Sequence, residues 1–67
     1  MIRVRLNGEE RSLPDGTTVA RLLEELGRSP KWAAVELNRQ VLPRPVYDTT
    51  ALCDGDVLEV VHLVGGG

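Results

Sequence analysis

The chain has 67 residues, of which 42% are apolar and none is phenylalanine, so it predicts one small domain with an aliphatic core. Eight basic and ten acidic residues give a formal net charge of -2. This balance argues against nucleic acid as a partner, because phosphate neutralisation needs a basic face. A single cysteine excludes an internal disulfide, and no apolar run is long enough to cross a bilayer. We therefore expect a cytoplasmic protein without a membrane partner.

Residues 2–13 predict two strands joined by a tight turn. The apolar residues of IRVRL alternate with arginines, which is the period-two pattern of a half-buried strand. Asn7-Gly8 follows directly and suits a two-residue I′ turn, because both positions accept a positive φ. The return strand ends at Leu13, before the turn sequence PDG.

Residues 17–27, TTVARLLEELG, change to the period of a helix. Thr18 is the expected N-cap, and Gly27 stands where a glycine ends a helix. The apolar residues between them recur at i, i+3, i+4 and i+7, which places one apolar stripe on the helix: Val19, Leu22, Leu23 and Leu26.

The second half of the chain predicts three further strands, at residues 33–37, 41–42 and 57–64. The first two are joined by a short connection near Arg39-Gln40. Two prolines follow the short strand, at positions 43 and 45, and confine it to a sheet edge because proline cannot donate to a ladder. A sheet with one helix has only one of its faces covered.

The last predicted strand is apolar on both faces. If Leu58 and Val60 point to the helix, then Glu59, Val61 and Leu63 point to the opposite face. Two of these three residues are apolar, and no second helix is expected to cover them. They form either a docking surface for a partner or ordinary scattered surface residues. We favour docking at Val61 and Leu63, because three glycines follow at once.

No arrangement of side chains predicts a catalytic residue or a metal site. His62 has no carboxylate or nucleophile placed near it, and Cys53 lies beside acidic residues, which favours a small structural hydrophobe. Trp32 is expected at the edge of the core. Residues 54–56, DGD, lack the other ligands of a calcium loop and predict a turn.

Because no side chain is a candidate for chemistry, the reactive group that we consider is the main-chain carboxylate of Gly67. A carboxylate is a poor electrophile until it is activated, for instance as a mixed anhydride with AMP. Because glycine has no Cβ atom, Gly65 and Gly66 can pass through a narrow channel of a partner enzyme. Three extended residues reach about 10 Å, far enough to bring the carboxylate into a partner's active site.

The sequence resembles the sulfur carriers of thiamine biosynthesis, the ThiS family, which are small ubiquitin-like proteins. The stretches that carry the resemblance are NGEERSLPDGTTVARLLEELG, AVELNRQVLPR and DGDVLEVVHLVGGG. The resemblance implies an α+β fold of the β-grasp type, in which a mixed sheet of four to five strands packs on one helix. It also implies a domain at residues 1–64 and a flexible glycine tail at residues 65–67.

The resemblance further implies a protein cosubstrate rather than an enzyme, with no bound cofactor. An adenylating enzyme of the ThiF type would use ATP to adenylate Gly67. Sulfur from a donor such as a cysteine desulfurase would then replace AMP and leave a thiocarboxylate, 1-thioglycine, at Gly67. Thiazole synthase, ThiG, would take that sulfur. The carrier alone is expected to be a monomer.

Related carriers leave other functions open. The small subunit of molybdopterin synthase, the carriers for tRNA thiolation and a carrier for cysteine synthesis use the same kind of terminus. A ubiquitin-like modifier would be conjugated to lysines through Gly67. An interaction module with chemically inert glycines is the third possibility.

Overall fold

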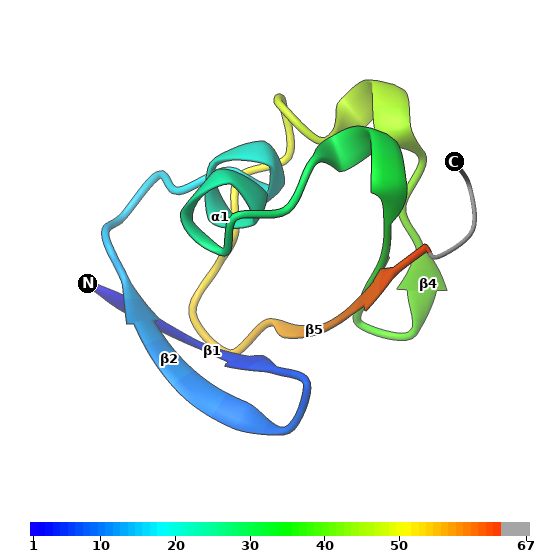
Figure 1. The fold of residues 1–67 in the computed structure, drawn as a ribbon. Coiled ribbons are helices and arrows are strands. Elements are labelled where there is room, and N and C mark those ends of the chain that lie inside the picture. The colour runs from blue at the N-terminus through cyan, green and yellow to red at the C-terminus, as the bar shows by residue number, and fades with distance from the viewer. Residues whose placement is uncertain (64–67) are drawn as a thin grey trace.

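Within residues 1–63, which the computed structural model describes, five strands form one mixed sheet and one α-helix packs across one of its faces (Figure 1). The strand order is β2-β1-β5-β3-β4. Strands β1 and β5 run parallel, and the other neighbouring pairs are antiparallel. The elements are β1 (Ile2–Leu6), β2 (Glu9–Leu13), α1 (Val19–Glu25), the 3-10 helix η1 (Pro30–Trp32), β3 (Ala33–Leu37), β4 (Gln40–Val41), the 3-10 helix η2 (Arg44–Val46) and β5 (Val57–His62).

The first hairpin and the helix form as the sequence predicts. Asn7 and Gly8 both have positive φ values, 49° and 83°, as a I′ turn requires. The Thr18 side chain caps α1 by accepting a hydrogen bond from Arg21 N at 3.1 Å. At the other end Gly27 takes a φ of 72°, and its N–H donates to Glu24 O at 3.0 Å.

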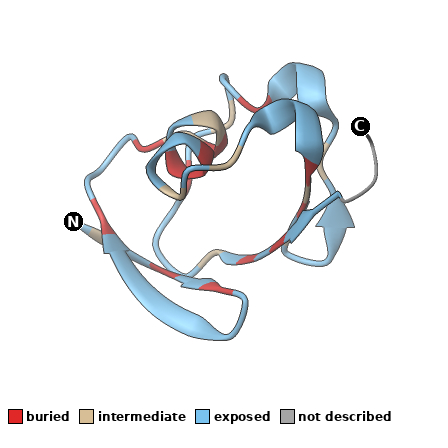
Figure 2. Ribbon diagram, in the orientation of Figure 1, coloured by how far each residue is buried: buried red, intermediate tan, exposed pale blue. Residues whose placement is uncertain are grey.

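The core lies between α1 and the sheet and is aliphatic apart from Tyr47. This ring is 3% exposed, and its hydroxyl donates to Ala33 O at 3.4 Å. The buried hydrophobic residues are Val4, Leu6, Leu13, Val19, Leu22, Leu23, Ala33, Val35, Tyr47, Leu52, Leu58 and Val60. Figure 2 shows buried positions that alternate with more exposed ones along β1, β3 and β5, which confirms the predicted periodicity of these strands, whereas β2 buries only its last residue, Leu13.

Four local predictions differ from the structure. The second hairpin turns at Asn38-Arg39, one residue earlier than predicted, because Asn38 readily takes the left-handed conformation at a φ of 52°. Cys53 is exposed, since the adjacent Leu52 fills the buried position and the chain turns at Cys53. Trp32 is 36% exposed and lies outside the core cluster. Strand β5 ends at His62, and residue 64 lies outside the described residues.

Two asparagines hold the backbone of β5 from both sides. The Asn7 side chain accepts from Val60 N at 2.8 Å and donates to Val60 O at 3.1 Å. The Asn38 side chain accepts from Val57 N at 2.9 Å, and its backbone N–H donates to Val57 O at 2.7 Å. Both asparagines belong to hairpin turns, so each turn residue also extends the sheet by one pair of hydrogen bonds.

Replacing Asn7 by alanine should lower the free energy of unfolding by about 2–5 kcal/mol, because two hydrogen bonds are lost and alanine is strained at positive φ. Asn7→Gly is the matched control, since glycine keeps the backbone conformation and loses only the hydrogen bonds, about 1–3 kcal/mol. Urea unfolding of the three proteins measures both values. Two variants as stable as the wild type would show that the Asn7 side chain does not anchor β5.

Candidate functional site

The expected reactive group and the tail that carries it, Gly65, Gly66 and Gly67, lie outside the described residues. The structure describes the strand that leads to them and the surface around that strand. The site is therefore built from β5, the adjacent strand β3, the edge strand β4 and two hollows of the surface.

Strand β5 divides its side chains between two faces, as the sequence predicts. Leu58 and Val60 are 0% and 6% exposed and belong to the core. On the opposite side Val57, Val61 and Leu63 are 44%, 58% and 38% exposed. The backbone N–H of Leu63 still donates to Trp32 O at 2.6 Å, so the β3–β5 ladder continues past His62. The alternation of faces therefore extends to Leu63.

Neighbouring strands enlarge this apolar surface. Ala34 on β3 lies opposite Val61, and Val41 on β4 lies opposite Glu36, so both share the face that points away from α1. Val41 is 76% exposed, the largest exposed fraction of any valine in residues 1–63. We call this surface the open face; its apolar residues are Ala34, Val41, Val57, Val61 and Leu63.

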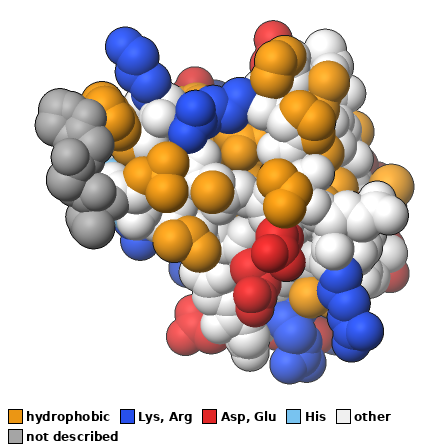
Figure 3. Space-filling view, turned by 90° about the vertical axis from the view of Figure 1, so that its right-hand side faces the viewer, with side chains coloured by type: hydrophobic (Ala, Val, Ile, Leu, Met, Phe, Trp, Pro, Cys, Tyr) orange, Lys and Arg blue, Asp and Glu red, His pale blue; other side chains and the backbone are white. Residues whose placement is uncertain are grey.

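An apolar groove lies at the β3–β4 edge of the sheet. Its volume is about 240 Å³, and it runs between the start of β3 and the segment that leads into η2. Figure 3 shows hydrophobic side chains gathered on this side of the molecule, with acidic side chains next to them. A groove of this composition can take apolar side chains of a protein partner. Its lining residues are Ala33, Ala34, Val35, Val41, Leu42, Pro43, Arg44 and Tyr47.

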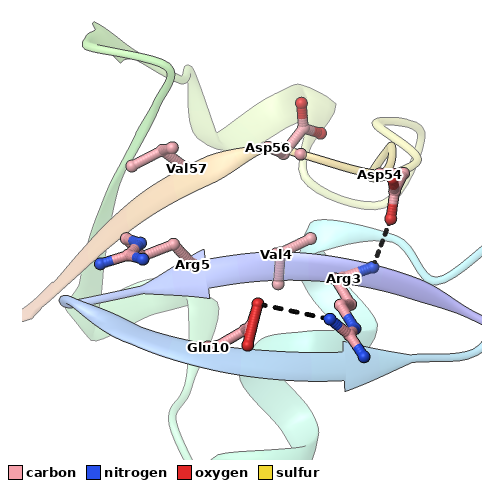
Figure 4. A pocket seen from close by; sticks show the side chains of 8 residues that line it. Arg3, Val4, Arg5, Glu10, Asp54, Asp56 and Val57 are labelled. Atoms are coloured by element: carbon pink, nitrogen blue, oxygen red, sulfur yellow. Dashed lines mark hydrogen bonds and ion pairs between the residues drawn. The ribbon is translucent and has the colours of Figure 1, made fainter.

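A second hollow, of about 210 Å³, lies between β1, β2 and the turn before β5 (Figure 4). Its acidic groups already bind the protein's own backbone. Asp54 Oδ1 accepts from Arg3 N at 2.7 Å, and Asp56 Oδ2 accepts from Cys53 N at 2.7 Å. Glu10 pairs with the Arg3 guanidinium at 3.9 Å. These polar groups stabilise the turn and the hairpin, and we do not assign them to substrate.

The described residues do not assemble a metal-binding cluster of three or more His, Cys, Asp or Glu side chains. His62 and Cys53, the two single candidates considered from the sequence, are both exposed and belong to different parts of the fold. None of the helices in residues 1–63 is long and apolar enough to cross a membrane.

Sequence reasoning missed Val41 and the groove as parts of this surface. The alternation in β5 placed Val61 and Leu63, because that pattern is local. The contribution of Val41 depends on the pairing of β4 with β3 and of β3 with β5. The sequence around Val41-Leu42, with two prolines after it, does not indicate which strand this short segment pairs with.

The comparisons with known proteins agree with this geometry. A sulfur carrier protein ThiS from Thermus thermophilus is 45% identical over 64 residues, which are 96% of this chain and 98% of the relative. A thiamine biosynthesis protein (ThiS) from Geobacter metallireducens has a crystal structure with a TM-score of 0.82 and 32% identity, covering 98% of this chain and 100% of that chain. This structural match confirms the predicted β-grasp fold.

A thiazole synthase from Magnetococcus marinus is 42% identical over 66 residues, which are 98% of this chain. The chain spans 20% of the length of that relative. The model of the ThiS family itself matches residues 4–67. This match covers nearly the whole sequence, and the chain belongs to the ThiS family.

Proposed function

We propose that this chain carries sulfur for thiamine biosynthesis as a thiocarboxylate on Gly67. The family assignment makes it a sulfur carrier protein, a protein cosubstrate rather than a catalyst. The observation that carries the proposal is the extent of the family match, which runs through residue 67 and includes the three glycines. The open face beside the end of β5 supports it, because an enzyme that acts on the tail needs a surface on which to hold the carrier.

The chemistry needs two steps at the Gly67 carboxyl group. A carboxylate oxygen attacks the α-phosphorus of ATP on an adenylating enzyme of the ThiF type, and pyrophosphate leaves. A persulfide sulfur of a donor such as a cysteine desulfurase then attacks the acyl carbon and displaces AMP. The product is an acyl disulfide between Gly67 and the donor. A thiol then attacks the donor's sulfur and forms a disulfide with it, and the thiocarboxylate, 1-thioglycine, leaves on Gly67. The carrier itself holds no cofactor in this scheme, and ATP is bound by its partner.

Thiazole synthase is the proposed acceptor of the sulfur. Two relatives named thiazole synthase each contain a segment that is 42% identical to this chain and makes up 20% of the relative. In those proteins a carrier-like segment and the remainder of the synthase are one polypeptide. This arrangement supports a direct contact between the two parts, since joined domains meet at a high effective concentration.

In this proposal the chain consists of a domain at residues 1–64 and a tail at residues 65–67. Gly65 and Gly66 pass through the partner's channel, because residues without a Cβ atom allow a close approach. Val61 and Leu63 dock at the mouth of that channel; both are exposed, as this role requires. A reducing compartment, the cytoplasm, suits the exposed free thiol of Cys53.

Other uses of the same terminus make different products. A carrier for molybdopterin or tRNA thiolation would form the same thiocarboxylate but would give its sulfur to another acceptor. A ubiquitin-like modifier would form amide bonds to lysines of other proteins. The identity of the acceptor and the mass of the product therefore separate these functions.

Incubation with the adenylating enzyme, ATP and a sulfur donor should raise the intact mass by the difference between one sulfur and one oxygen atom. A variant that lacks Gly67 should keep its mass, because its terminal carboxylate then lies on Gly66 and ends one residue short, about 3.5 Å, of the position at which the partner enzyme acts. Intact-protein mass spectrometry checks both. An unchanged mass of the wild type would contradict the carrier function, and adducts on lysines of other proteins would identify a modifier.

Replacing Val61 by lysine should weaken binding to thiazole synthase about tenfold or more, because an apolar contact of the open face is lost. The free energy of unfolding should fall by no more than about 1 kcal/mol, since residue 61 lies outside the core. Calorimetric titration and urea unfolding measure the two effects.

The control for this variant is Ser12→Lys, which adds the same charge on β2 at the opposite edge of the sheet. It should bind as the wild type does. A Val61→Lys protein that does not fold would contradict the assignment of the faces. One that folds and binds normally would contradict docking through Val61.

A further inference from the structure

Two glutamates lie directly opposite each other at the centre of the open face. Glu36 on β3 pairs in register with Glu59 on β5, and both are exposed. The hydrogen bonds from Asn38 N to Val57 O and from Leu63 N to Trp32 O mark the hydrogen-bonded positions of this ladder. The alternation of an antiparallel ladder makes Glu36 and Glu59 such a pair too, with Cα atoms about 5.5 Å apart. One cation can therefore contact both carboxylates.

No cation of the described chain neutralises this pair. The ion pairs found in residues 1–63 join Met1 to Asp15, Arg3 to Glu10 and Arg21 to Glu24. Arg5 shares the open face and lies beside Val57 through the β1–β5 pairing, but it forms no ion pair with either glutamate. Like charges placed directly opposite each other destabilise a sheet, so the pair opposes folding.

The acidic pair is surrounded by apolar side chains. Val41 lies opposite Glu36 across the β3–β4 ladder, and Val57 and Val61 precede and follow Glu59 by two residues on the same face. A partner that covers these valines also removes water from the two carboxylates. The residues that contribute most to binding lie near the centre of an interface, where surrounding contacts exclude water, and charges buried there need partners of opposite sign.

We propose that the open face docks a surface of thiazole synthase that inserts an arginine side chain between Glu36 and Glu59. An arginine fits better than a lysine, because its planar guanidinium offers several N–H groups to two carboxylates at once. The acidic pair thus selects a basic group, and the valines around it provide the apolar contact. The inference rests on the proposed function for the identity of the partner, and on the described residues for the chemistry of the contact.

The test uses Glu36→Gln and Glu59→Gln, singly and together, in the full-length chain with thiazole synthase. Each single variant should weaken binding about 10-fold or more, because the arginine then loses half of its countercharge inside the interface. The wild-type affinity should fall as NaCl is raised, and the double variant should show a flatter salt dependence. The control is Glu25→Gln, which removes the same charge from an exposed position on α1 and should change the affinity less than about twofold.

Urea unfolding separates this role from a structural one. Since the glutamates repel each other in the free chain, each substitution should raise the urea midpoint or leave it unchanged while binding weakens. Variants that bind as the wild type does would overturn the inference, and so would variants whose stability and binding fall together. If the wild-type chain itself does not bind thiazole synthase, both the proposed partner and this inference fail. Normal wild-type binding with unaffected glutamine variants overturns this inference alone.

Discussion

The central position of β5 is the constraint on which the rest of the structure depends. β5 pairs with β1 on one side and β3 on the other, so it joins the N-terminal hairpin to the β3–β4 hairpin within one sheet. The ladder with β1 has just two residue pairs, and the Asn7 side chain extends it to Val60. The strand that leads toward the glycines is thereby the one most firmly built into the fold. In the proposed complex, a partner that holds the tail would therefore act on an anchored strand.

The alternation of β5 also separates the residues of the core from those of the proposed docking surface. Leu58 and Val60 contribute to the core, whereas Val61 and Leu63 contribute exposed apolar area on the other side. Because one face serves folding and the other is free to bind, the residues of the open face can vary without rebuilding the core. This separation follows from the covering of one sheet face by α1.

The parts of the fold that were predictable depend on residues close together in the sequence. The Asn7-Gly8 turn, the Thr18 cap and the alternation of β5 are each decided within a few positions, and the structure confirms all three. The exposure of Cys53 and the role of Asn38 were not predictable, because they depend on how the turn before β5 meets the second hairpin. The pairing of Glu36 with Glu59 likewise needs the strand order, which no local pattern contains.

The composition of the open face is not what the fold alone requires. A sheet that served only its own stability would gain by placing a basic residue opposite Glu59, or a β-branched residue that packs across the strands. The chain instead places a second carboxylate there and surrounds both with exposed valines. In the proposed complex, a partner covers the valines and places a positive charge beside the two carboxylates. The repulsion that lowers the stability of the free carrier is then replaced by an attraction that raises the affinity of the complex.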